Sequence, residues 1–327
     1  MKRTGRIGMA ACVVLLLGIF SVSGALAQAP MVIKMGHIYP PDSLYSKTIE
    51  RIAKNVETHT NGKVKIEIYG SASLGDWREV AEGLQIGTVQ MSFESVGTLD
   101  RYNPLPGIEA FPYLFRDLDH WKKFWFSPLA QQLQDEVAAK TKFRTVGAIY
   151  RGSRNLTCNR EIKSIDDLKG LKLRVPPLKM YRMTWEAFGA APVPMAFTEL
   201  FTAMQQGTVD GQENPLNIIN DFKFNEVCKY LVMTKHVLGT MTYIFYEPWF
   251  EKLPADVKGV LVKDIQEGCT WANGEAEKAE ESLKADLVKK GMKLIEPDLA
   301  PYRAKTANII NDFPDLKGYY DKIKALQ

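Results

Sequence analysis

The regular alternation of strand and helix patterns constrains this chain most. Residues 63–69 (KVKIEIY) alternate apolar and polar side chains with period two, as a half-buried strand does. Around them, strands and helices are predicted in the order βαβαβ over residues 31–38, 44–58, 63–69, 77–86 and 89–93. This order predicts an α/β layer with a mainly parallel sheet.

A second unit of the same kind is predicted from about Arg151 onward. Ser164 can cap a short helix, with Asp167 at its third position and Gly170 as its stop. A strand over 171–175 follows, and then two helices over 181–188 and 198–206.

Residues 254–290 are predicted to form one long, charge-rich helix that ends before Gly291. Such a length exceeds that of an ordinary globular helix. Because sustained apolar heptads are missing, we expect a brace across domains and not a coiled coil. Two α/β units with a crossing helix suggest a cleft, and open α/β sheets bind ligands beyond the carboxyl ends of their strands.

The N-terminus has the three parts of an export signal. Lys2, Arg3 and Arg6 precede an apolar run over 9–22, and the small-x-small sequence Ala25-Leu26-Ala27 follows. The run is shorter than the ~20 apolar residues that span a bilayer. We therefore expect residues 1–27 to be a signal peptide cleaved after Ala27, and the mature protein to be periplasmic.

Charge and cysteine usage exclude several classes of protein. The chain has 42 basic and 38 acidic residues, and the predicted signal peptide removes three basic ones, which leaves about +1. This balance gives no electrostatic case for a nucleic-acid partner. Without a CxxC or a Cys/His cluster we expect no metal site and no cofactor. An oxidising compartment would permit a Cys158–Cys228 disulfide, but buried free thiols are at least as compatible with the spacing.

Motifs for catalysis are also missing from the sequence. It contains no GxSxG, HExxH, phosphate loop or GxGxxG. The four histidines are scattered, without a carboxylate or nucleophile at a telling spacing: His37, His59, His120 and His236. We therefore predict no catalytic residue and no enzyme.

The segment GLKLRVP places a basic pair on one strand face. Lys172 and Arg174 lie opposite the apolar positions of the predicted strand. One interpretation is a solvated basic face. The other is that Arg174, at the carboxyl end of the strand, points into the cleft and binds a carboxylate with two parallel hydrogen bonds.

The segment VDGQENPLNII carries a second ambiguity. Asn214 followed by Pro215 is typical of a helix start, with Asn214 as cap and Pro215 at the first helical position. A helix start that faces a cleft also offers donors to an anion. Glu213 lacks a partner carboxylate, so a structural role is predicted for it.

These segments together resemble one family. GLKLRVP, FGAAPVPMAFTELFTAMQQGTVDGQENPLNII and KFNEVCKYLVMTKH are similar to the DctP-type substrate-binding proteins of tripartite ATP-independent periplasmic (TRAP) transporters. The resemblance implies a two-lobed α/β periplasmic binding protein, type II-like, with crossing strands and a long C-terminal helix that spans the hinge. Lobe I would comprise residues 28–151 and 240–279, and lobe II residues 152–239 and 280–327.

The resemblance also implies a ligand and its contacts. The ligand would be a small organic acid whose carboxylate pairs with Arg174 and accepts from Asn214. Phe197 would pack on apolar ligand surface and Glu94 would accept from ligand hydroxyl or amino groups. Arg154 is a further family pocket position.

The opposite wall of the cleft matches the family only in place. Tyr39 and Trp77 would form this wall, with His37 close by. Two interpretations of Trp77 are equally favoured. It is either a platform that stacks on the ligand or a helix residue packed under the cleft.

The implied activity is capture and delivery. A monomeric receptor would close on the acid and dock on the TRAP membrane subunits. A sensor that presents the acid to a receptor kinase would share every pocket residue, so this alternative stays open. A lyase or isomerase on the same scaffold, and a receptor of an ATP-driven transporter, are less favoured.

Overall fold

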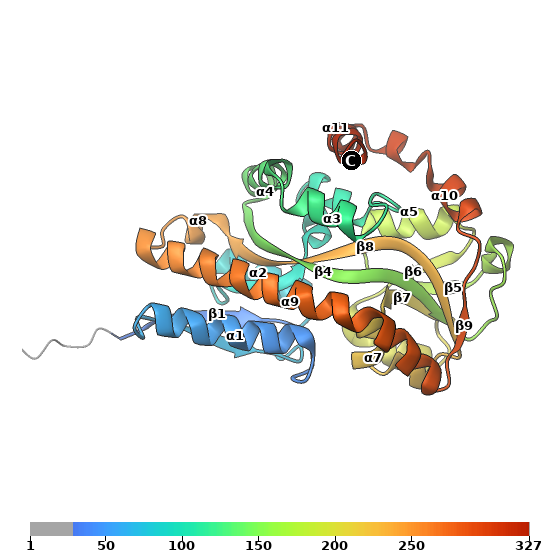
Figure 1. Cartoon of the computed structure of the whole chain (residues 1–327), viewed down its shortest axis with the longest axis horizontal. Helices are drawn as coiled ribbons and strands as arrows, with labels where there is room; N and C mark the ends of the chain where they lie inside the picture. The colour runs from blue at the N-terminus through green and yellow to red at the C-terminus, as the bar shows by residue number, and fades with distance from the viewer. Residues whose placement is uncertain (1–28, 327) are drawn as a thin grey trace, which may run out of the picture.

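A computed structural model describes residues 29–326. The predicted signal peptide and its cleavage site therefore lie outside the described residues. Nine strands form one sheet in the order β2-β1-β3-β8-β4-β7-β5-β6, with β9 paired to β8 (Figure 1). The strands are β1 (Met31–Gly36), β2 (Val64–Tyr69), β3 (Met91–Ser95), β4 (Phe143–Cys158), β5 (Lys172–Val175), β6 (Ala191–Pro194), β7 (Gly211–Pro215), β8 (Tyr230–Tyr246) and β9 (Lys293–Ile295).

Helices cover both faces of this sheet. The α-helices are α1 (Leu44–His59), α2 (Trp77–Ile86), α3 (Leu118–Trp125), α4 (Pro128–Thr141), α5 (Lys179–Ala187), α6 (Leu200–Gln205), α7 (Leu216–Asp221), α8 (Glu247–Phe250), α9 (Ala255–Lys289), α10 (Ala300–Thr306) and α11 (Pro314–Lys324). Short 3-10 turns are η1 (Val96–Arg101), η2 (Leu105–Ala110), η3 (Ile165–Leu168), η4 (Phe197–Glu199), η5 (Phe224–Glu226) and η6 (Ile309–Asp312). No helix within residues 29–326 is long and apolar enough to cross a membrane.

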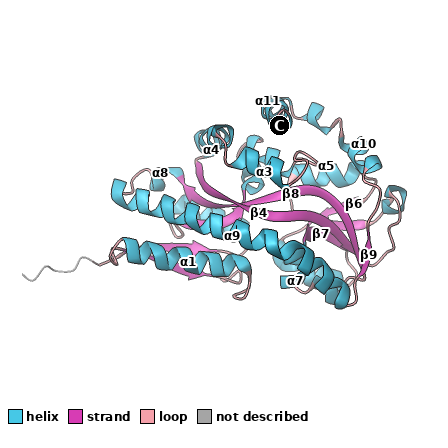
Figure 2. Ribbon diagram, viewed as in Figure 1, coloured by secondary structure: helices cyan, strands magenta, loops and turns pink. Residues whose placement is uncertain are grey.

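The predicted βαβαβ unit is confirmed as β1, α1, β2, α2 and β3. The short capped helix exists as η3, and its capping box is formed by Ser164 and Asp167. The expected long helix is α9, which lies along the length of the molecule (Figures 1 and 2). The two-lobed α/β fold class is therefore confirmed.

The expectation of a mainly parallel sheet needs a correction at its centre. The strand pairs on the two sides, β1–β2, β1–β3, β5–β6 and β5–β7, are parallel. The pairs β3–β8, β4–β8 and β4–β7 are antiparallel. The reason is that the long strands β4 and β8 run through both halves and join them, side by side in Figure 2.

The predicted helix start at Asn214 is wrong. Asn214 lies in β7, opposite Asn155 of β4, and α7 begins at Leu216 after Pro215. Ladder pairing with β4 holds Asn214 in an extended conformation, so the strand and not the local Asn-Pro signal decides the backbone here.

Helix α9 is fastened where β4 and β8 lose their regular register. The register shifts between Val146 and Ile149 and again between Tyr150 and Gly152. In this gap the Asn273 side chain of α9 accepts from the Tyr150 N–H at 2.7 Å and donates to the Ala148 carbonyl at 3.0 Å. The helix thus satisfies backbone groups that the irregular ladder leaves unpaired.

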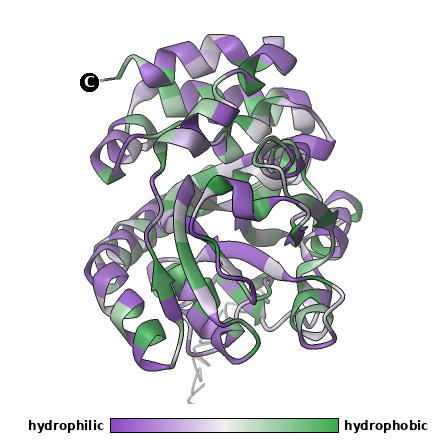
Figure 3. Ribbon diagram, turned by 90° about the vertical axis from the view of Figure 1, so that its right-hand side faces the viewer, coloured by the Kyte–Doolittle hydropathy of each residue, from purple (hydrophilic) through white to green (hydrophobic). Residues whose placement is uncertain are grey.

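The core lies on both sides of the sheet. One apolar cluster gathers residues from α2, α3, α4, α5 and α11, and the other gathers residues from α1, α6, α7 and α9. The helices alternate between hydrophilic and hydrophobic residues along their length, as Figure 3 shows. Such amphipathic helices each bury one face against the sheet.

The cysteines of the described residues are free and buried: Cys158, Cys228 and Cys269. The free-thiol alternative therefore holds, and Cys158 and Cys228 form no disulfide in this structure. Burial raises the pKa of Cys228 to about 12, so this thiol stays protonated and unreactive at neutral pH.

Gly147 tests how closely α9 packs on β4. Its φ is +75°, and a Cβ added there would lie 2.5 Å from the Cys269 Sγ of α9. Gly170 is a matched control, because its φ is +70° and an added Cβ would meet nothing within 4 Å. We expect Gly170→Ala to cost ~1–2 kcal/mol of unfolding free energy from left-handed strain. Gly147→Ala should cost ~1–3 kcal/mol more from overpacking. Urea denaturation measures both, and equal costs would contradict the close packing.

Candidate functional site

Arg174 is a buried cation without a carboxylate partner. It lies in β5 and is 2% exposed. Its Nε and Nη2 both donate to the Met195 carbonyl, at 3.0 and 2.8 Å. Within residues 29–326 no carboxylate oxygen lies within 4.0 Å of it, and Nη1 makes no hydrogen bond. The solvated-face interpretation of Arg174 is therefore wrong, although Lys172 on the same strand is exposed.

Burial lowers the pKa of Arg174 to about 10, so the guanidinium stays charged at neutral pH. The ring of Phe197 lies 5.5 Å from its guanidinium carbon. An unpaired buried charge is costly, and an anion that arrives with hydrogen-bond acceptors removes that cost. This geometry leaves Nη1 of Arg174 free to meet an anion, and its role as the carboxylate anchor stays a prediction.

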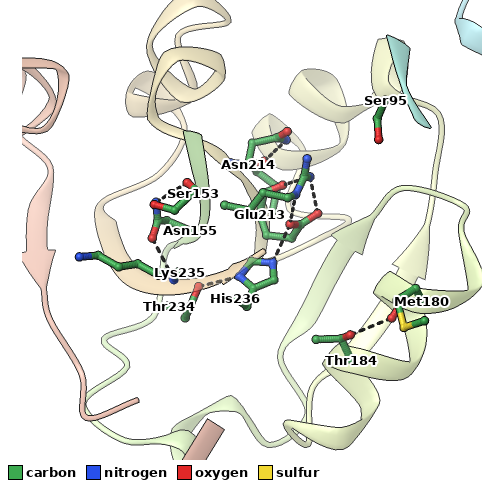
Figure 4. A network of polar contacts seen from close by, with 12 residues as sticks. Ser95, Ser153, Asn155, Met180, Thr184, Glu213, Asn214, Thr234, Lys235 and His236 are labelled. Atoms are coloured by element: carbon green, nitrogen blue, oxygen red, sulfur yellow. Dashed lines mark hydrogen bonds and ion pairs between the residues drawn. The ribbon is translucent and has the colours of Figure 1, made fainter. Parts of the chain in front are cut away.

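Arg154 is neutralised inside the protein. Its Nε and Nη2 donate to the carboxylate of Glu213, both at 2.6 Å. His236 Nε2 lies 2.9 Å from the same carboxylate and its Nδ1 bonds Thr234, as Figure 4 shows. Burial alone would raise the pKa of Glu213, but Arg154 and His236 lower it to about 2. The structural role predicted for Glu213 is confirmed, and only Nη1 of Arg154 is left for a ligand.

Glu94 is a buried carboxyl with a vacant acceptor. It lies in β3, one residue before the strand ends, is 8% exposed, and its Oε1 has no hydrogen-bond partner. Burial raises the pKa of Glu94 to about 8. Repulsion by Asp76 adds to this rise in pKa, and the Arg151 guanidinium opposes it. Its environment differs from that of an ordinary surface carboxylate.

His37 offers a donor to the same region. Its Nδ1 accepts from the Tyr39 N–H at 3.2 Å, and its buried Nε2 has no partner. Burial lowers the pKa of His37 to about 4, so the ring is neutral at pH 7. Because Nδ1 accepts, the neutral ring carries its proton on Nε2.

The remaining predicted positions are more tightly packed. Asn214 is 1% exposed and donates to Gln212 Oε1 at 2.6 Å. Tyr39 is fully buried against Tyr45 and Phe93. Trp77 belongs to an apolar core cluster, which favours the packing interpretation. Contacts of these three side chains with a ligand stay predictions.

Sequence reasoning missed Asp76, which ties the two halves together. Its Oδ1 accepts from the Trp77 N–H at 2.7 Å and so caps α2. Its Oδ2 accepts from the Phe197 N–H at 3.0 Å, 121 positions along the chain. The Asp76-Trp77 dipeptide before a helix is a local capping signal. The hydrogen bond to Phe197 has no such signal in the sequence, because it joins residues 121 positions apart.

The other histidines have hydrogen-bond partners within the protein, as predicted. His59 pairs with Asp264 at 2.8 Å, and His120 Nε2 bonds the Ile323 carbonyl at 2.8 Å. The described residues contain no group of three or more His, Cys, Asp or Glu side chains that could hold a metal ion.

Comparison with known proteins agrees with this fold. The sequence profile of "Bacterial extracellular solute-binding protein, family 7" (DctP) matches residues 35–315. A solute-binding protein of Roseobacter denitrificans is 33% identical over 291 residues, 88% of each chain. The sialic acid-binding periplasmic protein SiaP of Vibrio cholerae is 32% identical over 298 residues, 91% of this chain and 93% of that one.

A crystal structure of a TRAP periplasmic solute-binding protein from Polaromonas, bound to D-erythronate, superposes with a TM-score of 0.86. It is 31% identical and the match covers 91% of this chain and 99% of that one. The fold and these matches thus define a two-lobed solute-binding receptor. The chain belongs to the DctP family of bacterial extracellular solute-binding proteins, as the resemblance indicated.

The buried pair can be tested against an exposed one. Glu213→Gln should cost roughly 3–5 kcal/mol of stability, because it leaves the Arg154 charge buried and unpaired. Glu186→Gln removes an exposed partner of Arg182 and should cost ~0–1 kcal/mol. Denaturant unfolding of both variants measures the difference, and similar costs would contradict the assigned role of Glu213.

The raised pKa of Glu94 predicts that the stability of the protein depends on pH. Its folded pKa of about 8 lies above the ordinary value of 4.5. Between these values the unfolded carboxyl is ionised while the folded one holds a proton, so stability falls as pH rises. Glu94→Gln removes this contribution. Melting curves of ligand-free protein should therefore show the wild type losing at least ~1 kcal/mol relative to Glu94→Gln between pH 4.5 and 8. Parallel curves would contradict the raised pKa.

Proposed function

We propose that this receptor captures a small organic acid and that Arg174 binds its carboxylate. The unpaired, buried guanidinium of Arg174 is the observation that carries the proposal. Glu213 cannot serve as its counter-ion, because Arg154 and His236 already hold that carboxylate.

The other predicted positions would meet the rest of such a molecule. Glu94 Oε1 offers an acceptor and His37 Nε2 a donor, both buried and without partners. Phe197 covers Arg174 and supplies apolar surface. Asn214 and Arg154 would add donors on one side, and Tyr39 and Trp77 would form the wall on the other.

Closure of the lobes would complete the site. The hydrogen bonds that join the predicted lobes include those of Asp76 to Phe197 N–H at 3.0 Å, Asp100 to Lys179 N–H at 3.3 Å, and Tyr45 to Asn217 at 3.0 Å. The predicted boundaries at 151/152 and 239/240 meet where Gly152 pairs with Gly239, beside the register shift of β4. These features support a hinge at that point.

Solved relatives support an acid as the ligand, and the family supports delivery to a transporter. The Roseobacter protein was solved with L-galactonate and the Polaromonas protein with D-erythronate, both hydroxylated acids. We propose that this chain acts in the periplasm after cleavage behind Ala27, as a monomer that docks on TRAP membrane subunits. No catalytic step, cofactor or nucleic-acid partner is part of this function.

Two alternatives make different predictions. A periplasmic sensor would share the pocket, but its gene would neighbour a receptor kinase and not transporter subunits. A lyase or isomerase would change its ligand, so the same acid recovered intact after incubation with the protein would exclude it.

The carboxylate anchor can be tested on β5 itself. Arg174→Ala should lower affinity about a thousandfold, because it leaves a buried carboxylate without its partner at a cost of ~3–5 kcal/mol. Lys172→Ala is the matched control, since Lys172 is an exposed cation on the same strand. A thermal-shift screen of organic acids first identifies the ligand, which adds ~2.7 kcal/mol of stability at a hundred times its dissociation constant. Calorimetry then measures affinity, and an Arg174→Ala variant with wild-type affinity would show that the anchor is misassigned.

A further inference from the structure

Asp76 divides its buried carboxylate between the two predicted lobes. The residue is 6% exposed, and its Oδ1 accepts from the Trp77 N–H at 2.7 Å within lobe I. Its Oδ2 accepts from the Phe197 N–H at 3.0 Å in lobe II. One side chain therefore holds the start of a helix in one lobe and a backbone group of the other. Separation of the lobes would break the second bond.

The backbone that Asp76 contacts also positions the predicted anchor. Met195, two residues before Phe197, accepts from Arg174 Nε and Nη2 at 3.0 and 2.8 Å. The Phe197 ring lies 5.5 Å from the Arg174 guanidinium carbon. Residues 195–197 thus orient Arg174 through a carbonyl and cover it with a ring. Asp76 holds this same segment from the opposite lobe.

The loop that ends in this carboxylate, residues 70–76, has a strained backbone. Ser71 and Ala72 have φ angles of 53° and 58°, in the left-handed region that is costly for residues with a side chain. The Ser71 N–H donates to the Tyr39 carbonyl at 3.2 Å, and the Ala72 N–H donates to the His37 carbonyl at 3.1 Å. Such strain persists where the surrounding structure imposes it, and it gathers at ligand clamps.

Two other hydrogen bonds between the predicted lobes do not reach this segment. Asp100 accepts from the Lys179 N–H at 3.3 Å, and Tyr45 accepts from Asn217 at 3.0 Å. Neither bond involves residues 195–197. The contact of Asp76 differs from both because it acts on the backbone that orients the anchor.

We propose that Asp76 is a positioning residue that latches the closed lobes by holding the Phe197 backbone over Arg174. This inference rests on the proposed function and deepens it. The latch joins protein to protein and makes no contact with the acid. It would therefore prolong the residence of every bound acid alike, and selection among acids would fall to other residues.

Stopped-flow binding to the full mature chain tests the latch. The probes are the tightest-binding acids from a panel of mono- and dicarboxylates of four to six carbons. Asp76→Ser can still cap the helix, but its single oxygen on a shorter side chain cannot bond Phe197 as well. Asp76→Asn keeps the length and one acceptor oxygen. Asp117→Ser is a matched control, since Asp117 caps α3 within lobe I by accepting from the His120 N–H at 2.8 Å.

We expect Asp76→Ser to raise koff by roughly tenfold to a hundredfold, the range of a hydrogen bond to a charged group. The factor should be the same for each acid. Because the latch forms after the acid is captured, kon should change little. Asp76→Asn should recover part of the loss, and Asp117→Ser should bind like the wild type.

Hydrogen exchange at the Phe197 amide gives a second readout, one that a general loss of stability would not move alone. Saturating acid should slow this exchange in the wild type and in Asp117→Ser, and much less in Asp76→Ser. Core amides of the same sample report global stability, so a less stable variant is still informative.

An unchanged koff in Asp76→Ser, or a Phe197 amide that stays as protected as in the wild type, would overturn the latch. A rise in koff that differs between acids would show that Asp76 contacts the acid itself, which also overturns it. In either case binding by the wild type leaves the proposed function standing. A wild type that binds none of the panel would contradict the proposed function, and this inference with it.

Discussion

The positive charge of Arg174 is buried in β5 and solvated by one backbone carbonyl, that of Met195. An unpaired charge in this position is costly, and an anion that completes its coordination would remove that cost. The carboxylate of Glu213 is not available to Arg174, since Arg154 and His236 bind it. Under the proposed function, a ligand carboxylate would pair with Arg174, and the surrounding groups would distinguish one acid from another.

The crossing strands explain how such a site can be both buried and accessible. Strands β4 and β8 run through one continuous sheet, so the halves stay connected while their register breaks near Gly152 and Gly239. Asn273 of α9 fills the hydrogen-bonding gap of β4 at the same level. Asp76 then joins the halves across the site through the Phe197 backbone. Two halves linked by an irregular double strand are an arrangement that would permit the proposed closure.

Local sequence patterns predicted the elements whose cause is local. The period-two alternation of β2, the capping box of η3 and the uninterrupted length of α9 were all visible in the chain. Local patterns did not locate β4 and β8, which the family resemblance implied only as crossing strands. The reason is that a strand buried on both faces lacks the alternation of a half-buried one. Asn214 was misplaced because ladder pairing with Asn155 overrides its local helix-start signal.

The candidate site also combines features that the local sequence indicates with features that it does not. Arg174 could be singled out from its strand position, but its burial and lack of a partner could not. The Arg154–Glu213 bond joins positions 59 residues apart, and Asp76 reaches Phe197 over 121. No pattern within one element encodes such pairs.

The central claim is tested most directly by a crystal structure of the protein with its acid bound. A ligand carboxylate oxygen should lie within hydrogen-bonding distance of Arg174 Nη1, at about 2.7–2.9 Å for a charge-assisted bond. The Arg174 contact with Met195 should be retained. A carboxylate bound elsewhere, with Arg174 Nη1 still unpaired, would contradict the account.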